Sequence, residues 1–191
     1  MKNNLPAILV LAAAIAVVSF VTLPLHAAVL SCILGFIMLA IAATDMREFI
    51  IPDIFSLPAI PTGLLATWLL AEPSEAAGVV LEHLLAAIVG GGGLYAIARI
   101  YEAARGHAGL GLGDVKLFAA GGAWIGWQGL PSVLLIASFA ALGFVAFLWL
   151  VRGKTVRATT ALPFGVFLAP AIWIVWVFDQ ILDAGVPSVL S

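Results

Sequence analysis

Long apolar runs separated by short polar connections dominate the pattern along the chain. We predict seven membrane-spanning helices from these runs, at about residues 5–23, 27–44, 54–71, 79–98, 115–130, 132–151 and 162–182. Most runs approach the roughly 20 apolar residues that cross a bilayer. Because the runs are continuous and do not alternate with polar residues, they favour helices over a membrane barrel. The predicted fold class is therefore all-α, a polytopic membrane protein.

Composition strengthens this prediction and narrows the function classes. Hydrophobic residues make up 64% of the 191 residues and charged residues 9%, whereas a soluble domain carries about a quarter charged residues. The net charge of −2 gives no reason to expect nucleic acid, so the lipid bilayer is the partner that composition predicts. The single cysteine, Cys32, excludes an intrachain disulfide and a cysteine-based zinc site within the chain.

The basic residues orient the predicted helices. All eight Lys and Arg fall on one side of the seven-span arrangement: Lys2, Arg47, Arg99, Arg105, Lys116, Arg152, Lys154 and Arg157. By the positive-inside rule this side is cytoplasmic, which places the N-terminus inside and the C-terminus outside. We expect a multi-pass protein of the inner (plasma) membrane. The first run has no clear cleavage site before Pro24 and His26, so we interpret it as a retained helix.

Two carboxylates stand at cytoplasmic ends of the predicted spans. Asp45 ends the second span and Asp114 begins the fifth. Charged groups near a membrane interior are costly and are functional candidates. Each also has a structural explanation, since Asp114 could cap its helix and Asp45 could pair with Arg47. Taken together they lie at the same face and depth. Two carboxyl groups that share a site do not both ionise easily, so one can act as base and the other as acid.

Several neighbours extend this candidate site. Gly111 and Gly113 allow the backbone to approach a substrate without a side chain in the way. Pro52 suits the first turn of the third span, and Asp53 lies in the same turn, where a negative charge is favourable. Lys116 lies two residues after Asp114 and points away from it on a helix, so its partner is either another acid or a lipid phosphate.

These residues carry a resemblance to a known family. Asp45 with Ile51-Pro52-Asp53 resembles the first-aspartate motif of the type IV prepilin peptidases. Gly111 to Leu117 resembles their GxGD motif, and Gly121 to Gly126 is similar to the small-residue segment that follows it. Pro163-Phe164-Gly165 resembles a stretch in the family's last helix. The resemblance covers about residues 30–171.

The resemblance implies an intramembrane aspartyl endopeptidase, with Asp45 and Asp114 as its catalytic pair. It implies that the enzyme removes the short basic leader of type IV prepilins or pseudopilins. The apolar N-terminal helix of the pilin would then lie beside the membrane helices of the enzyme. No metal or other cofactor is expected. Pro52, Asp53, Gly111, Gly113, Lys116, Pro163, Phe164 and Gly165 are the residues expected to bind substrate or shape the site.

The chain also departs from the larger members of that family. Those members carry paired CxxC motifs that bind zinc and accompany N-methylation, whereas this chain has only Cys32. We therefore expect the short, peptidase-only branch, with residues 1–26 as an added transmembrane helix and 27–191 as a six-helix domain. Presenilin-like proteases also use a GxGD aspartate, but there the partner aspartate lies in the immediately preceding span. In this chain the third and fourth predicted spans separate Asp45 from Asp114, which favours the prepilin peptidases.

Two other functions remain open from the residues. A proton- or cation-coupled transporter would use the Asp45–Asp114 pair as its ion site, and it predicts carboxylates near the bilayer midplane on discontinuous helices. An inactive homologue would act only in pilus assembly, although both aspartates are present.

Overall fold

The computed structural model describes residues 5–107, 109–152 and 162–185. The described residues form six α-helices and no strands: α1 (Leu5–Thr22), α2 (Leu25–Glu48), α3 (Asp53–Leu70), α4 (Ala76–Arg105), α5 (Leu112–Arg152) and α6 (Gly165–Gly185). Each is long and apolar enough to cross a membrane. The predicted all-α membrane fold is confirmed.

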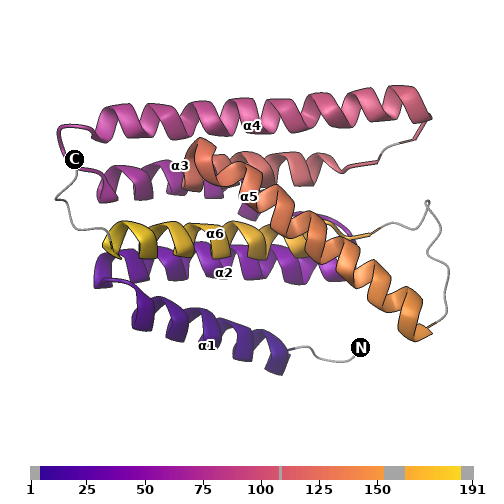
Figure 1. Cartoon of the computed structure of the whole chain (residues 1–191), viewed down its shortest axis with the longest axis horizontal. Helices are drawn as coiled ribbons and strands as arrows, with labels where there is room; N and C mark the ends of the chain where they lie inside the picture. The colour runs from indigo at the N-terminus through magenta and orange to yellow at the C-terminus, as the bar shows by residue number, and fades with distance from the viewer. Residues whose placement is uncertain (1–4, 108, 153–161, 186–191) are drawn as a thin grey trace.

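The helices run back and forth along one direction, so that consecutive helices are antiparallel (Figure 1). Helix α6 packs between α2 and α5, and α4 packs along α5, whereas α1 packs against α2 at the margin of the bundle. Buried apolar side chains of α2, α5 and α6 form most of the core, including Leu34, Leu117, Leu168 and Ile172. These three helices therefore form the framework that positions the site.

Helix α5 contains a break that differs from the sequence prediction. The predicted boundary between spans 115–130 and 132–151 is wrong, because the chain stays helical through Pro131 and leaves helical geometry at Gly126. Gly126 has φ 71° and ψ −165°, a conformation that essentially only glycine adopts. After Gly126 the second arm of α5 turns back along the bundle (Figure 1). The two predicted spans are therefore the two arms of one broken helix.

Side chains from α3 and α4 support the break. Nδ1 of His83 lies 3.2 Å from the carbonyl oxygen of Ala123 and 3.2 Å from Oγ1 of Thr67. An unbroken helix would satisfy the Ala123 carbonyl with the N–H four residues later. His83 can supply a donor to this carbonyl at the break, which limits the cost of an unpaired backbone group in an apolar region.

Interhelical hydrogen bonds and small residues join the helices elsewhere. Nε1 of Trp124 donates to the carbonyl oxygen of Ala59 at 2.8 Å, which ties α5 to α3. Nε1 of Trp173 donates to Oγ of Ser31 at 3.1 Å, which ties α6 to α2. At Gly122 an added Cβ would lie 2.7 Å from the backbone of α4. Close backbone approach and polar contacts of this kind are the usual means of helix association in membranes.

The two ends of the helix bundle differ in the charged residues that they carry. The end that carries the C-terminus of α4 and the N-terminus of α5 also carries the described basic residues: Arg47, Arg99, Arg105, Lys116 and Arg152. The opposite end carries Glu72, Glu75 and Glu82. Lys2, Lys154 and Arg157 lie outside the described residues. This separation agrees with the pattern used to orient the chain, and the orientation in the membrane stays a prediction.

Candidate active site

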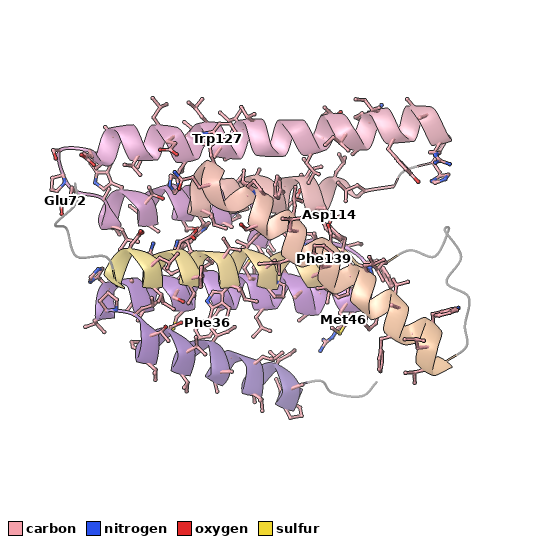
Figure 2. All side chains as sticks on the ribbon, in the orientation of Figure 1. Phe36, Met46, Glu72, Asp114, Trp127 and Phe139 are labelled. Atoms are coloured by element: carbon pink, nitrogen blue, oxygen red, sulfur yellow. The ribbon has the colours of Figure 1, made fainter. Side chains whose placement is uncertain are left out.

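A cavity opens at the basic end of the bundle, between the end of α2 and the starts of α3 and α5. Its volume is about 290 Å³. Figure 2 shows Asp114 and Met46, the neighbour of Asp45, toward this end of the bundle. The cavity is lined by Asp45, Phe49, Ile50, Ile51, Asp53, Gly111, Leu112, Gly113, Asp114 and Lys116. Six of the residues singled out in the sequence therefore meet in one place.

Asp45 lies in the last turn of α2 and is 4% exposed. The helix ends at Phe49, whose left-handed backbone (φ 55°) lets its N–H donate to the Asp45 carbonyl at 3.0 Å. The Asp45 side chain faces the start of α6, where Oδ2 accepts the N–H of Val166 at 3.1 Å. The N-terminus of a helix carries partial positive charge and favours an anion. Asp45 therefore links α2 to the first turn of α6.

Asp114 is the third residue of α5 and is 9% exposed. Its Oδ2 accepts the N–H of Gly111 at 3.3 Å, the backward contact that an acidic residue makes in the first turn of a helix. The predicted N-cap position is thus wrong, because Asp114 lies inside the first turn, although one of its oxygens accepts a backbone N–H as the capping interpretation required. The other oxygen, Oδ1, is buried and has no hydrogen-bond partner within the described part of the chain. A buried polar atom of this kind calls for an explanation, and capping does not supply one.

Neither carboxylate forms an ion pair within the described residues, and the Lys116 that shares their cavity pairs with Asp53. The ion pairs of the described residues are Arg99–Glu102 and Lys116–Asp53, so the suggested pairing of Asp45 with Arg47 is absent from this part of the structure. Two buried carboxylates without a counter-charge do not both ionise easily. The arrangement can therefore hold one protonated and one ionised carboxyl group against a substrate.

The partner of Lys116 is an acid. Its Nζ donates to both oxygens of Asp53, at 2.7 Å to Oδ1 and 2.9 Å to Oδ2. Asp53 is the first residue of α3, and Pro52 occupies the capping position just before it. The sequence predicted Pro52 inside the first turn of the helix, whereas Pro52 lies one residue before the first helical residue. The ion pair joins the start of α3 to the start of α5 at the rim of the cavity.

The two glycines of the GxGD motif differ in what they face. An added Cβ on Gly113 would lie 2.8 Å from Cβ of Ile51, so that side of Gly113 is already occupied. An added Cβ on Gly111 would lie 3.3 Å from Oδ2 of Asp114. The geometry gives Gly113 a packing role, and a role for either glycine in substrate approach stays a prediction.

The Pro163-Phe164-Gly165 segment forms the turn that begins α6. The carbonyls of Pro163 and Phe164 accept the first N–H groups of the helix, and neither residue lines the described cavity. Gly165 does touch the site. Its added Cβ would lie 2.8 Å from Oδ2 of Asp45 and 2.8 Å from Cδ1 of Ile51, so the approach of α6 to Asp45 depends on glycine.

Sequence reasoning missed two parts of the site. The N–H of Val166, which binds Asp45, is a backbone group and has no sequence signal beyond the start of a helix. Ile51 is 7% exposed, whereas Ile50 and Asp53 on either side of it are exposed. In the sequence, Ile51 looks like any other apolar residue of the chain. Its position directly before the IPD proline was the available signal, but that signal did not indicate which way the side chain points.

The described residues contain no group of three or more His, Cys, Asp or Glu side chains placed to hold a metal ion. The break in α5 at Gly126 lies at the far end of its first arm from Asp114. The discontinuous helix that a transporter site would use is therefore not at the carboxylates.

Comparison with family models gives a match to the type IV leader peptidase family over residues 32–146. The match covers more than half of the chain and includes both buried aspartates. The chain belongs to the type IV leader peptidase family. The resemblance noted from the motifs is thereby confirmed.

Curated relatives carry the name prepilin leader peptidase/N-methyltransferase. The protein of Burkholderia pseudomallei strain 1026b is 42% identical over 134 residues, which is 69% of this chain and 40% of that protein. The protein of Pseudomonas putida is 34% identical over 140 residues, 72% of this chain and 45% of that protein. That of Aeromonas salmonicida strain A449 is 33% identical over 170 residues, 88% of this chain and 56% of that protein.

The chain thus spans about half the length of the curated relatives that it matches. No solved structure gives a significant match. The comparisons therefore establish family membership through sequence, and the geometry of the site comes from this structure alone.

Proposed function

We propose that the protein is an intramembrane aspartyl endopeptidase that removes the basic leader of type IV prepilins or pseudopilins at the cytoplasmic membrane face. The observation that carries the proposal is the meeting of Asp45 and Asp114, both buried, in one cavity at the basic end of the bundle. Membership of the leader peptidase family supports the substrate class.

The proposed chemistry uses the two carboxyl groups in different protonation states. The ionised group takes a proton from a water molecule, whose oxygen adds to the carbonyl carbon of the scissile peptide bond. The protonated group gives its proton to the carbonyl oxygen of the substrate as the water adds. The C–N bond then breaks as the group that took the water's proton passes it to the leaving amine, and a hydroxyl proton of the intermediate returns to the other group as the new carboxyl product forms. The buried Oδ1 of Asp114, which has no partner among the described residues, is available to bind the water or the substrate carbonyl.

The substrate's charge fits the proposed orientation. A prepilin leader is basic, and the cavity presents the carboxylates of Asp45, Asp53 and Asp114 with Lys116 as its one lining cation among the described residues. The apolar helix that follows the leader would remain in the bilayer beside α2, α3 and α5. We also propose that the protein lies in the inner (plasma) membrane, with the described basic residues on the cytoplasmic side.

Two finer parts of the proposal concern the extent of the protein's activity. We propose that residues 1–191 carry no N-methyltransferase activity, because their only cysteine is Cys32 and the resemblance attaches methylation to paired CxxC motifs. We also propose that residues 1–26 add a helix to a six-helix domain at 27–191. In support, α1 packs mainly on α2 and the family match begins at residue 32.

Co-expression with a prepilin tests the function. Wild type is expected to shorten the prepilin by its leader, whereas Asp45→Asn and Asp114→Asn should each leave it unprocessed. The matched control is Glu102→Gln, which makes the same acid-to-amide change at the same end of the bundle, on a side chain that is 43% exposed. Mass spectrometry of the product reports both cleavage and N-methylation.

Normal processing by both asparagine variants would overturn the aspartyl mechanism. A product that is cleaved but carries no N-terminal methyl group supports the peptidase-only proposal. A methylated product from cells without any other methyltransferase of this kind would contradict it.

A further inference from the structure

The short link between α2 and α3 turns one side chain into the site. Phe49 and Ile50 are 56% and 59% exposed, whereas Ile51 is 7% exposed. The left-handed backbone at Phe49 ends α2, and the extended backbone at Pro52 precedes α3. The direction of the link is therefore set on both sides of Ile51, which enters the core beside the cavity.

Ile51 faces two glycines, one that precedes Asp114 and one that precedes the residue that binds Asp45. Its Cβ is 2.8 Å from the position of a Cβ on Gly113, the residue before Asp114. Its Cδ1 is 2.8 Å from the position of a Cβ on Gly165. Gly165 precedes Val166, whose N–H holds Asp45. One side chain thus lies between the first turn of α5 and the first turn of α6.

The chemistry of these residues suits a spacer. Isoleucine is branched at Cβ and has few rotamers, so its width between two elements is well defined. Two glycines face it, and a Cβ on either would intrude on Ile51 at a distance that side-chain atoms do not tolerate without a shift. Ile51 therefore limits how closely the start of α6, whose Val166 N–H binds Asp45, approaches the start of α5, which carries Asp114.

The Lys116–Asp53 ion pair holds the link in place from the outside. Asp53 follows Ile51 by two residues and Lys116 follows Asp114 by two residues, so the pair ties together the segments that carry the spacer and one aspartate. The side chains are 39% and 57% exposed. Exposed pairs of this kind contribute little to stability, so the pair adds a tie between the two segments to the packing of Ile51 and is not by itself a strong restraint.

We propose that Ile51 is a positioning residue that sets the spacing of Asp45 and Asp114, and that the Lys116–Asp53 pair fixes the link that carries it. This inference rests on the proposed function, because it assumes that the two aspartates act together. It assigns the IPD segment a task distinct from substrate contact, which is to hold α5 and α6 at the correct separation.

Steady-state kinetics of the full chain in lipid vesicles test the spacer, with a synthetic prepilin peptide as substrate. Ile51→Ala is expected to lower kcat about tenfold or more while KM changes less than twofold. It should also move the two limbs of the pH–rate profile relative to each other, because the interaction between the carboxyl groups depends on their separation. Ile51→Val keeps the branched Cβ that faces Gly113 but removes the Cδ1 that faces Gly165, so its kcat should fall between those of wild type and Ile51→Ala.

Ile54→Ala is the matched control, since Ile54 is three residues away, 74% exposed and not part of the cavity lining. It should leave kcat and the pH–rate profile unchanged. An Ile51→Ala protein with wild-type kcat and pH profile would overturn the spacer, as would a loss confined to KM. If Ile51→Ala does not fold, Gly113→Ala perturbs the same contact from the other side and should also reduce kcat.

Charge reversal tests the ion pair. Lys116→Asp and Asp53→Lys should each lower kcat, and the double variant should recover much of the loss because it restores the pair in the opposite sense. If the kcat of the double variant is no higher than that of the less active single variant, this role of the pair is overturned. The asparagine variants of Asp45 and Asp114 separate the two proposals. If they abolish cleavage while Ile51→Ala and the charge variants behave as wild type, only the positioning inference fails.

Discussion

At the residue scale, the site consists of a few polar groups held by apolar contacts. Asp45 and Asp114 were predictable because charged residues are sparse in this chain, so each one near a span is conspicuous. Ile51 was not predictable, because the chain contains many isoleucines and only the backbone around Phe49 and Pro52 turns this one inward. The partner of Lys116 was open from the sequence, since pairing between α3 and α5 depends on how the helices pack.

Gly165 gives a prediction at this scale. Gly165→Ala adds a methyl group that would lie 2.8 Å from both Oδ2 of Asp45 and Cδ1 of Ile51, so α6 must move away from the site. We expect peptidase activity to fall at least tenfold in the vesicle cleavage assay. Gly143→Ala is the control, because an added Cβ there meets no atom within 4 Å. Equal activity of the two variants would contradict the account of Gly165.

At the scale of elements, helix positions were largely predictable and the break in α5 was not. Hydropathy identifies where a helix is apolar enough to span, and five predicted spans overlap α1, α2, α3, α4 and α6, although α4 continues to Arg105, well past the predicted end at 98. The stretch that forms α5 contains several glycines and one proline. Hydropathy does not indicate which of them departs from helical geometry, and the structure places the departure at Gly126 because His83 and Thr67 meet the chain there.

Gly126 therefore supplies a prediction about stability. Gly126→Ala forces a side chain into φ 71°, and its Cβ would also lie 3.0 Å from Nε2 of His83. We expect the free energy of unfolding to fall by about 1–3 kcal/mol. Unfolding of the purified protein in mixed micelles with increasing denaturing detergent measures this change.

Gly93→Ala is the matched control for that experiment. Gly93 lies within α4, and an added Cβ there meets no atom within 4 Å. Alanine has the higher helix propensity, so this variant should be as stable as wild type or more stable. A Gly126→Ala protein as stable as the Gly93→Ala protein would show that the break does not require glycine.

At the scale of the whole molecule, the distribution of charge agrees with the location of the site. The cavity that contains Asp45 and Asp114 opens at the end that carries the described basic residues, and a separate cavity of about 220 Å³ lies at the other end beside Glu72 and Glu75. The sequence predicted this polarity because Lys and Arg placement orients membrane helices. With the basic end in the cytoplasm, as we propose, the candidate site would face the side from which a prepilin leader is reached.

Cysteine labelling tests this orientation. In a Cys32→Ser background, single cysteines at Glu75 and His107 report on opposite ends of α4, and both positions are exposed. A membrane-impermeant maleimide should label Glu75→Cys in right-side-out vesicles and His107→Cys only in inside-out vesicles. The reverse pattern would place the site on the outer face and exclude the proposed access to the leader.

The most direct test of the central claim is a comparison of cleavage rates for purified wild type, Asp45→Asn, Asp114→Asn and the double asparagine variant. Each protein is reconstituted in lipid vesicles with a synthetic prepilin peptide, and product is measured by mass spectrometry. If the carboxyl groups act as one unit, each single variant should lose at least a thousandfold, and the double variant should be no slower than either single variant. Cleavage by either single variant within tenfold of the wild-type rate would contradict the aspartyl pair as the centre of the activity.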